Sequence, residues 1–404
     1  MNVKLTEVIQ IEYSFEFSKL CHLAKNLYNL ANWYVRQDFF NLNNLLTYYD
    51  LDLILKNKKA YQSLPSQTSQ QILIYVSRNW KSYFRGLEEY KNNFKKFKKK
   101  PNIPRYKKKN GESVVIFTNQ QCKLKQGCLY FPKSVNISPI RTRITERLRE
   151  VRIIPLGVKY KIEIVYEKEE KDLGLNKEHI LSIDLGLNNL ITAVNNNGCT
   201  PFIIKGGMIK SINQYYNKQL AYYRSIENKK GNFTDTKRIQ KLHLTRNNKL
   251  TTLFHRISKN IIEYCIKNNI GTIIIGYNHG WKQKINIGKR NNQKFVQIPF
   301  LKVVQQIEYK AKLKGFYVLT INESHTSKCS FLDNEPIKKH KKYIGKRISR
   351  GLFKTSNGIL LNADVNGAYN IMKKAFPNAI SADGIEAFGL MPQIIRQNVT
   401  DIII

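Results

Sequence analysis

Acidic residues are scarce in this sequence, and that shortage says more about function than any other feature of its composition. The 404 residues include 29 Asp and Glu against 68 Lys and Arg, which gives a formal net charge of +39. Like charges at this density repel one another and disfavour a compact isolated chain. A nucleic acid would neutralise them, and release of its condensed counterions would drive the binding. The composition therefore predicts a nucleic-acid partner and disfavours a merely soluble basic protein.

Long apolar runs and paired cysteines are also missing. No apolar stretch is long enough to span a bilayer, and the polar, alternating N-terminus does not resemble a signal peptide, so we expect no membrane partner. The six cysteines contain no CxxC pair: Cys21, Cys122, Cys128, Cys199, Cys265 and Cys329. This scatter argues against a disulfide framework and a zinc cluster, and we expect reduced thiols in a cytoplasmic protein.

The first half of the chain changes its hydrophobic period twice. Residues 3–14 alternate as a strand does, and from about residue 15 to residue 91 the apolar residues recur at helical three- and four-residue steps. Short strand-like runs separated by turn residues then occupy 113–167. Such runs predict a small β-barrel that the first strand completes, with the helical segment looped out between them.

A dense basic run, KNNFKKFKKKPNIPRYKKK, lies at residues 91–109. Two prolines stop any helix there. Phe94, Phe97 and Tyr106 stand between the cations, a pattern that suits phosphate contact combined with base stacking. A solvated charged face is the alternative interpretation. The other aromatic residues of the preceding helical segment are interpreted mainly as core packing.

The second half reads as three hairpin-linked strands followed by alternating helices and strands. The expected strands are 180–185, 190–194, 201–204, 272–275 and 316–322, and the expected helices are 211–229, 237–268, 300–314 and 364–374. This order is that of an RNase H-like fold, a mixed sheet with helices on its faces. The predicted class is therefore a multi-domain α+β protein, a β-barrel with a helical insertion followed by an RNase H-like mixed α/β domain.

Asp184 is the most informative acid in the chain. It lies within the apolar strand ILSIDLG, where an ionised side chain is costly unless it is paired or bound to a metal. Cleavage of a phosphodiester needs an activated water and a stabilised leaving oxygen, which two divalent ions can provide. Such ions prefer several carboxylate ligands. A buried structural Asp is the alternative.

Two further acids are candidates for the same site. Asp364 begins the last expected helix, where an Asp can also be a plain helix cap. Glu323 ends the strand before it, whereas the neighbouring strand ends in Gly276, which has no side chain to offer. Glu308 lies in mid-helix and is interpreted as a surface residue. We therefore expect Asp184, Glu323 and Asp364 to be the catalytic and metal-binding residues.

These motifs carry a resemblance to a known family. Residues 178–376 resemble the RuvC-type nuclease domain of TnpB proteins, which are related to the type V CRISPR effectors. The matching segments are ILSIDLGLNNLITAV with Asp184, Arg246-Asn-Asn-Lys, His255-Arg-Ile-Ser, ESHTSKCSFLDNEP, and LNADVNGAYNI with Asp364. The barrel and its insertion resemble the family only in pattern.

The resemblance implies a domain layout and a set of partners. The layout is a wedge barrel at 1–14 and 105–175, a recognition insertion at 15–104, a RuvC-like nuclease domain at 176–376 and a C-terminal tail at 377–404. The implied partners are a guide RNA from the transposon end, and double-stranded target DNA with a short adjacent motif. The implied cofactor is a pair of Mg²⁺ ions, or Mn²⁺, and the implied location is the bacterial cytoplasm, at the nucleoid.

The sequence departs from the family pattern at two places. The family commonly has its second acid where Gly276 stands, and a relocated Glu at position 323 would replace it. The family also commonly has a four-cysteine zinc ribbon before the last acid. Cys329 and His340 fall short of four ligands. We expect no zinc, and a basic insert at 329–361 that contacts nucleic acid through KKHKKYIGKRISR.

Three other functions are compatible with parts of this pattern. A nuclease-inactive, RNA-guided DNA-binding repressor would share the charge and the fold, but three suitably placed acids argue against it. A DNA strand transferase would need an end-binding module such as a helix-turn-helix, which the sequence does not show. A plain RNA-binding protein has no reason to keep Asp184 inside a strand.

Overall fold

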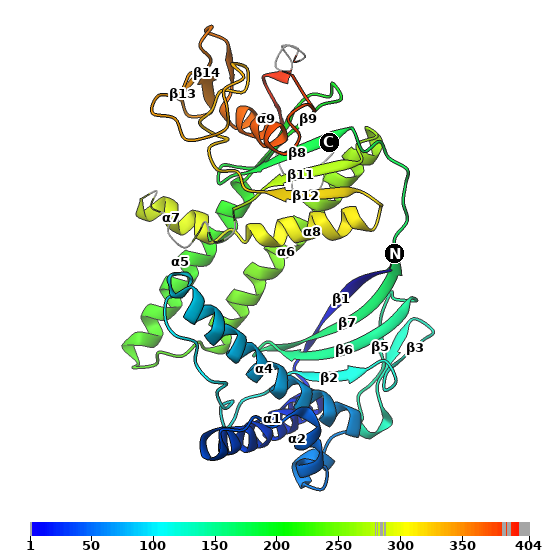
Figure 1. The fold of residues 1–404 in the computed structure, drawn as a ribbon. Coiled ribbons are helices and arrows are strands. Elements are labelled where there is room, and N and C mark those ends of the chain that lie inside the picture. The colour runs from blue at the N-terminus through cyan, green and yellow to red at the C-terminus, as the bar shows by residue number, and fades with distance from the viewer. Residues whose placement is uncertain are drawn as a thin grey trace. The chain divides into compact units, whose positions relative to one another are not determined.

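The computed structural model describes residues 2–278, 280, 282, 286, 288–381, 385 and 389–395. The chain divides into two compact units, residues 2–168 and the residues from 169 onward (Figure 1). Both units mix helices with sheets, as expected for a multi-domain α+β protein. No helix among the described residues is long and apolar enough to cross a membrane.

The first unit consists of a helical segment between a first strand and six later ones. Its elements are β1 (Asn2–Glu12), α1 (Phe15–Leu42), α2 (Tyr48–Leu55), α3 (Lys59–Gln62), α4 (Ser66–Asn92), η1 (Phe94–Lys96), β2 (Val115–Thr118), β3 (Lys123–Lys125), β4 (Cys128–Tyr130), η2 (Lys133–Val135), β5 (Ile140–Arg141), β6 (Arg147–Pro155) and β7 (Lys159–Glu169). The α-helices of this unit all lie between residues 15 and 92.

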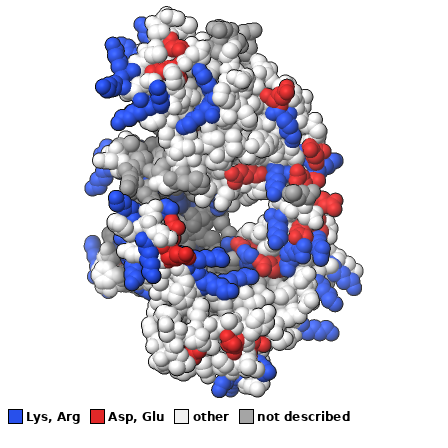
Figure 2. Space-filling model, in the orientation of Figure 1, with Lys and Arg blue, Asp and Glu red and all other residues white. Residues whose placement is uncertain are grey.

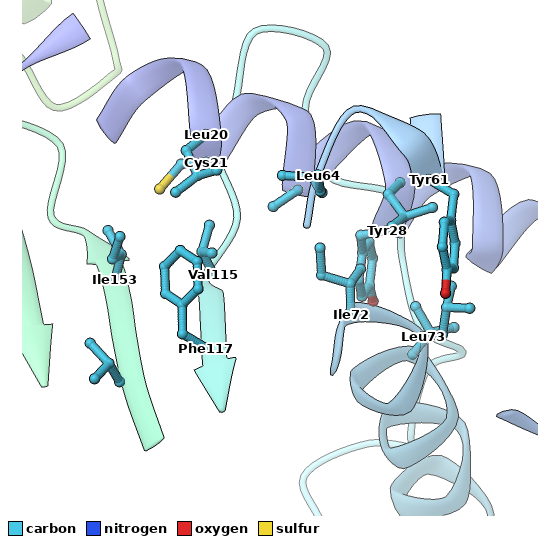
Figure 3. Packing of buried hydrophobic residues seen from close by; sticks show 14 of the residues in the cluster. Leu20, Cys21, Tyr28, Tyr61, Leu64, Ile72, Leu73, Val115, Phe117 and Ile153 are labelled. Carbon is cyan, nitrogen blue, oxygen red and sulfur yellow. The ribbon is translucent and has the colours of Figure 1, made fainter. Parts of the chain in front are cut away.

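Helix α1 is a central packing element of this unit. The Ser14 hydroxyl caps its N-terminus by accepting from the Phe17 N–H, and the helix ends at Asn43, which is in the left-handed region. Apolar residues at helical spacing bury one face of α1 against α4 and the sheet. Figure 3 shows Leu20 and Cys21 of α1 near Val115 and Phe117 of β2, while Tyr28 lies near Ile72 of α4.

The strands of the first unit form two sheets. One has four strands in the order β1-β7-β6-β2, and the other has three in the order β3-β4-β5. Strands β6 and β7 pair antiparallel over most of their length, from Arg147 opposite Glu167 to Pro155 opposite Tyr160. Closure of these strands into the expected barrel remains a prediction.

The second unit contains one large sheet and one small one. Its elements are β8 (Ile180–Leu185), β9 (Asn189–Asn195), β10 (Phe202–Lys205), α5 (Gly207–Lys229), α6 (Lys237–Lys267), β11 (Thr272–Gly276), α7 (Lys289–Val296), α8 (Phe300–Lys312), β12 (Tyr317–Ile321), β13 (Lys346–Ser349), β14 (Leu352–Lys354), β15 (Leu360–Asn362), α9 (Ala363–Ala375) and β16 (Gln393–Ile395). The small sheet, β13-β14-β15, lies in the expected basic insert.

The large sheet has six strands in the order β12-β11-β8-β9-β10-β16. Strands β8, β9 and β10 are antiparallel neighbours, whereas β11 runs parallel to both β8 and β12. Strand β16 pairs in parallel with β10, so residues 393–395 of the stretch expected to be a tail belong to the sheet. Residues 382–384, 386–388 and 396–404 of that stretch lie outside the described residues.

Helices cover both faces of the large sheet. Leu181, Ile183 and Leu185 of β8 pack in one core with α6 and α8. On the opposite face, Ile180 packs in another core with residues of α9, including Ile371. Because side chains alternate along a strand, the even-numbered residues of β8 point toward α9. This alternation decides which face carries the polar residues of the strand.

Candidate active site

Asp184 lies on the α9 face of the sheet, near the end of β8. Two residues earlier, the Ser182 hydroxyl donates to the Ala368 carbonyl of α9 at 2.8 Å. The helix approaches closely at Gly367, where an added Cβ would lie 3.3 Å from Asp184 Oδ2. The absence of a side chain at Gly367 therefore leaves room for the Asp184 carboxylate between strand and helix.

Glu323 reaches the same face from β12. In the parallel pair of β11 with β12, Gly276 lies opposite Ile321, two residues before Glu323. A Cβ added at Gly276 would lie 2.9 Å from Glu323 Oε2. Thus the Glu323 carboxylate lies in the space that a side chain at position 276 would enter.

Asn278 holds Glu323 in this position. The Glu323 backbone N–H donates to Asn278 Oδ1 at 3.0 Å, and the Asn278 amide donates to Glu323 Oε1 at 3.4 Å. The strand ends of β11 and β12 are therefore connected through one side chain. Asn278 was not singled out in the sequence, because an Asn after a strand is common in loops.

Asp364 lies in the first turn of α9, but it does not cap the helix. The cap is Asn362, whose side chain accepts from the N–H groups of Asp364 and Val365. The Asp364 carboxylate instead accepts from the Asn189 amide at 2.5 Å and pairs with the Arg347 guanidinium at 3.2 Å. The Asp364 side chain is consequently directed at β9 and at the basic insert.

The Asp184 carboxylate is affected electrostatically by both of the other two acids. Burial raises the pKa of Asp184 well above its usual range, and the negative charges of Glu323 and Asp364 raise it further. Burial also raises the pKa of Glu323 to about 7. Among the described residues Glu323 Oε2 is buried without a hydrogen-bond partner, an arrangement that is costly unless a cation or proton neutralises it.

A cavity of about 900 Å³ opens beside Asp184 and Asp364. Its lining is acidic at these two residues and basic at Lys205, Arg347 and Arg350. In the described parts of the chain, however, no three His, Cys, Asp or Glu side chains lie close enough to form a ligand group as they stand. The carboxylate oxygens of Asp184 and Asp364 are nevertheless the kind of donor that a hard cation prefers. Arg347 pairs with one oxygen of Asp364.

The loop after β12 is closed by hydrogen bonds around Cys329 and Glu335. Cys329 is buried, and both its thiol and the His340 ring contact the Pro336 carbonyl, at 3.5 and 2.7 Å. The buried Glu335 carboxylate accepts from two backbone N–H groups of the same loop and lies 3.9 Å from His340. A carboxylate thus ties together the segment that includes Cys329 and His340.

Arg246, which belongs to one of the sequence motifs, makes its contacts with other residues of the second unit. Its guanidinium donates to Asn213 Oδ1 at 2.9 Å and to the Gln297 carbonyl at 2.7 Å, and it lies over the Tyr216 ring. It therefore connects α5, α6 and the segment before α8. His255 lies farther along α6, where burial and the charges of Lys310 and Lys302 lower its pKa.

Basic side chains are more prominent than acidic ones on one face of the molecule. On the face of the molecule drawn in Figure 2, Lys and Arg side chains cover more of the surface than those of Asp and Glu.

The structure adds three residues to the candidate site that were not singled out from the sequence: Asn189, Asn278 and Arg347. Arg347 was noted only as part of a basic stretch, because its proximity to Asp364 depends on how β13 folds back.

Comparison with known proteins identifies relatives among TnpB-like proteins and among CRISPR-associated nucleases. Residues 163–282 match the OrfB_IS605 family model, described as a probable transposase, and residues 300–371 match the "Cas12f1-like, TNB domain" model. The chain is 24% identical to the "TnpB-like protein ORF457" of Acidianus two-tailed virus, over 88% of this chain and 82% of that one.

A CRISPR-associated relative is similar over a shorter region. The chain is 28% identical to the endodeoxyribonuclease Cas12f1 of Sulfoacidibacillus thermotolerans, over 54% of this chain and 50% of that one, so it spans about half of that relative. Among solved structures, a Cas12f1 in complex with sgRNA and target DNA is similar in fold, with a TM-score of 0.54 and 17% identity over 88% of this chain and 81% of that one. These matches confirm the resemblance to TnpB proteins that the sequence motifs carry.

Proposed function

We propose that this chain is an RNA-guided DNA endonuclease that cleaves phosphodiesters with Asp184, Glu323 and Asp364. One observation carries this proposal. Glu323 lies beside Gly276 and fills the space of a side chain there, on the face of the sheet that also bears Asp184. This geometry supports a carboxylate that has moved from the end of β11 to the end of β12.

The proposed fold of the second unit is RNase H-like. Three antiparallel strands, β10-β9-β8, continue into the parallel strands β11 and β12, with helices on both faces. For the first unit we propose a wedge barrel at 1–14 and 105–175 and a recognition insertion at 15–104. The nuclease domain would then occupy 176–376, with the basic insert at 329–361.

The proposed cofactor is a pair of Mg²⁺ ions, or Mn²⁺, held by Asp184, Glu323 and Asp364. Bound there, such ions would activate the attacking water and stabilise the leaving oxygen. Asn278 orients Glu323, and Asn189 orients Asp364. The unpartnered oxygen of Glu323 and the crowding of negative charge on Asp184 are both features that a divalent cation would relieve.

The proposed partners are a guide RNA from the transposon end and double-stranded DNA with a short adjacent motif. The formal charge of +39 supports a large nucleic-acid ligand. The similar Cas12f1 was solved with sgRNA and target DNA. In such complexes base pairing reads the sequence, and the protein reads duplex shape and the short motif.

A nuclease-inactive, RNA-guided repressor is the second candidate. The observation that favours it is the ion pair of Arg347 with Asp364, together with the lack, among described residues, of a ready ligand group for a metal. Such a protein would bind its target and leave it uncut.

One experiment separates the two candidates. RNA that co-purifies with the protein is sequenced, and plasmids matching its guide segment and carrying a randomised adjacent motif are incubated with the complex and Mg²⁺ or EDTA. We expect cleavage of matched plasmids in the presence of Mg²⁺ and no cleavage in the presence of EDTA. Sequence-specific gel shift without cleavage would favour the repressor, and the absence of any specific RNA would overturn the guided interpretation.

A further inference from the structure

The basic run that follows α4 is held along α1 in an extended form. Asn29 of α1 bonds to residue 107 twice, donating to the Lys107 carbonyl at 3.0 Å and accepting from the Lys107 N–H at 2.8 Å. One turn on either side, Lys25 donates to the Lys109 carbonyl and Asn32 donates to the Pro104 carbonyl. The polar face of α1 thus positions the backbone of residues 104–109.

The anchor at Asn32 is itself fixed from the core. Its amide oxygen accepts from the indole N–H of Trp80 at 2.9 Å, which leaves the amide nitrogen to donate to Pro104. Trp80 and Asn32 are both fully buried. The orientation of the extended segment is therefore set by buried hydrogen bonds, which lowers the entropy cost of binding a ligand along it.

Arg36 joins this segment to two exposed rings. Its guanidinium lies over the Tyr106 ring at 5.1 Å and over the Phe40 ring at 5.6 Å, and it donates to the Pro104 carbonyl at 3.1 Å. Phe40 is 60% exposed and Tyr106 is 45% exposed. A guanidinium held over two solvent-facing aromatic rings is a preorganised cation–π group.

The other aromatic residues of the basic run do not share this arrangement. Phe97 packs edge-on against Tyr90, and Phe94 is exposed but has no cation over its ring among the described residues. Lys107 turns back over the Tyr28 ring. Only the group formed by Phe40, Arg36 and Tyr106, here called the stacking platform, combines fixed geometry with exposed rings in the described part of this segment.

We propose that the stacking platform binds a nucleobase, with the flanking phosphates contacting the exposed cations Arg105, Lys108 and Lys109. Planar groups with a cation favour base stacking, and the charge of the segment favours a polyanion over an apolar partner. The inference rests on the proposed function only in that the ligand is a nucleic acid. The base can come from RNA or from DNA, and the test distinguishes the two sources.

The test compares matched variants of the full-length protein. Tyr106→Ala removes one ring of the platform, and Tyr106→Phe keeps that ring. Arg36→Lys keeps the positive charge but removes the planar guanidinium group. The control is Tyr49→Ala, since Tyr49 is 80% exposed in the same unit and no cation lies over its ring among described contacts. No hydrogen bond of the Tyr106 side chain occurs among the described residues, and thermal melting checks that each variant folds.

Binding is measured with oligonucleotides that carry a fluorescent 2-aminopurine base. Labelled RNA is exchanged against the co-purified RNA of the complex, and target DNA is added to the RNA-loaded complex. We expect Tyr106→Ala to weaken one of these by roughly 5-fold or more and to abolish the quenching of 2-aminopurine on stacking. Arg36→Lys should weaken it as well, whereas Tyr106→Phe and Tyr49→Ala should not.

Salt dependence separates stacking from charge. Tyr106→Ala should leave the slope of log affinity against log salt unchanged, whereas Lys108→Ala should reduce it by about one unit. If Tyr106→Ala weakens binding of RNA alone, the platform binds the guide. If it weakens binding of DNA alone, the platform binds the target. If Tyr106→Ala binds both like the Tyr49→Ala control, the platform proposal is overturned, while target cleavage, which tests the proposed function, is scored separately.

Discussion

At the scale of single residues, Glu323 and Gly276 form the most informative pair. They lie on neighbouring parallel strands, and the Glu323 carboxylate is 2.9 Å from where a Cβ at position 276 would stand. Glu308, the alternative acid in α8, instead accepts a hydrogen bond from Thr320 at 3.1 Å, and Glu263 is paired with Lys259 on the surface of α6. The geometry favours Glu323 over both alternatives.

The first prediction follows from this pair. Glu323→Gln keeps the size of the side chain and removes a negative oxygen ligand, so it should lower cleavage of a matched plasmid by about 100-fold or more, since even outer partners of metal ligands typically cost 10- to 100-fold. Asp184→Asn should behave alike. Gel-shift binding of the same target should stay nearly unchanged in both.

Glu308→Gln is the matched control and should remain active. Full activity in Glu323→Gln would refute the relocated ligand and direct the search to Glu308 or Glu263. No cleavage by the unmutated complex, with RNA, adjacent motif and Mg²⁺ all correct, would favour the repressor instead.

At the scale of elements, α9 connects the basic insert to the candidate site. Strand β15 ends at Asn362 and α9 begins at the next residue. Asn362 satisfies two N–H groups of the first turn, those of Asp364 and Val365. The helix cap therefore sets the direction of the Asp364 side chain, as well as stabilising the helix.

The second prediction concerns this cap. Asn362→Ala should destabilise the protein by about 1 kcal/mol, because two helix N–H groups lose their acceptor. Cleavage should fall as the first turn of α9 frays around Asp364. Hydrogen exchange of residues 363–367, measured with and without the change, reports the fraying directly. Asn362→Ser retains a capping oxygen and should behave like the unmutated protein, and equal exchange in the Ala variant would rule out this role.

The third prediction concerns zinc in the basic insert. Glu335 accepts from backbone N–H groups inside the loop, and the Cys329 thiol contacts a carbonyl, so the loop is closed by hydrogen bonds. Elemental analysis should find substantially less than one zinc per chain. A zinc chelator should leave the melting temperature unchanged, because no folding energy would come from the metal.

Stoichiometric zinc would show that Cys329 has ligand partners outside the contacts described here. Cys329→Ser serves as the matched variant. It should keep the elemental composition unchanged if the loop holds no zinc, and lose metal if it does.

At the scale of the whole molecule, the net charge dominates behaviour in solution. With +39 to neutralise, we predict that the protein purifies with a bound structured RNA and becomes poorly soluble when that RNA is digested. Nuclease treatment followed by light scattering is the measurement. A monodisperse RNA-free monomer without affinity for a specific RNA would contradict the prediction.

Much of the second unit could be predicted from periodicity. A strand was expected at 180–185 and β8 has those bounds, while α6 and α9 differ from expectation by about one residue at their ends. Strands β13–β15 and β16 were not predicted, because strands of three or four residues carry too few alternations to stand out and form only where a partner strand is available. Helix α7, of eight residues, was also missed.

The sequence by itself predicted a nucleic-acid partner, carried the resemblance to TnpB proteins and determined the strand that contains Asp184. Charge is a sum over residues, and hydrophobic period is a property of neighbours along the chain, so neither needs the fold. Only the tertiary structure decided that Glu323 lies beside Gly276, that Asp364 contacts Asn189 and Arg347, and that Arg36 lies over the rings of Phe40 and Tyr106. These contacts join residues from different elements, and they depend on strand register and on the path of loops, which no local pattern specifies.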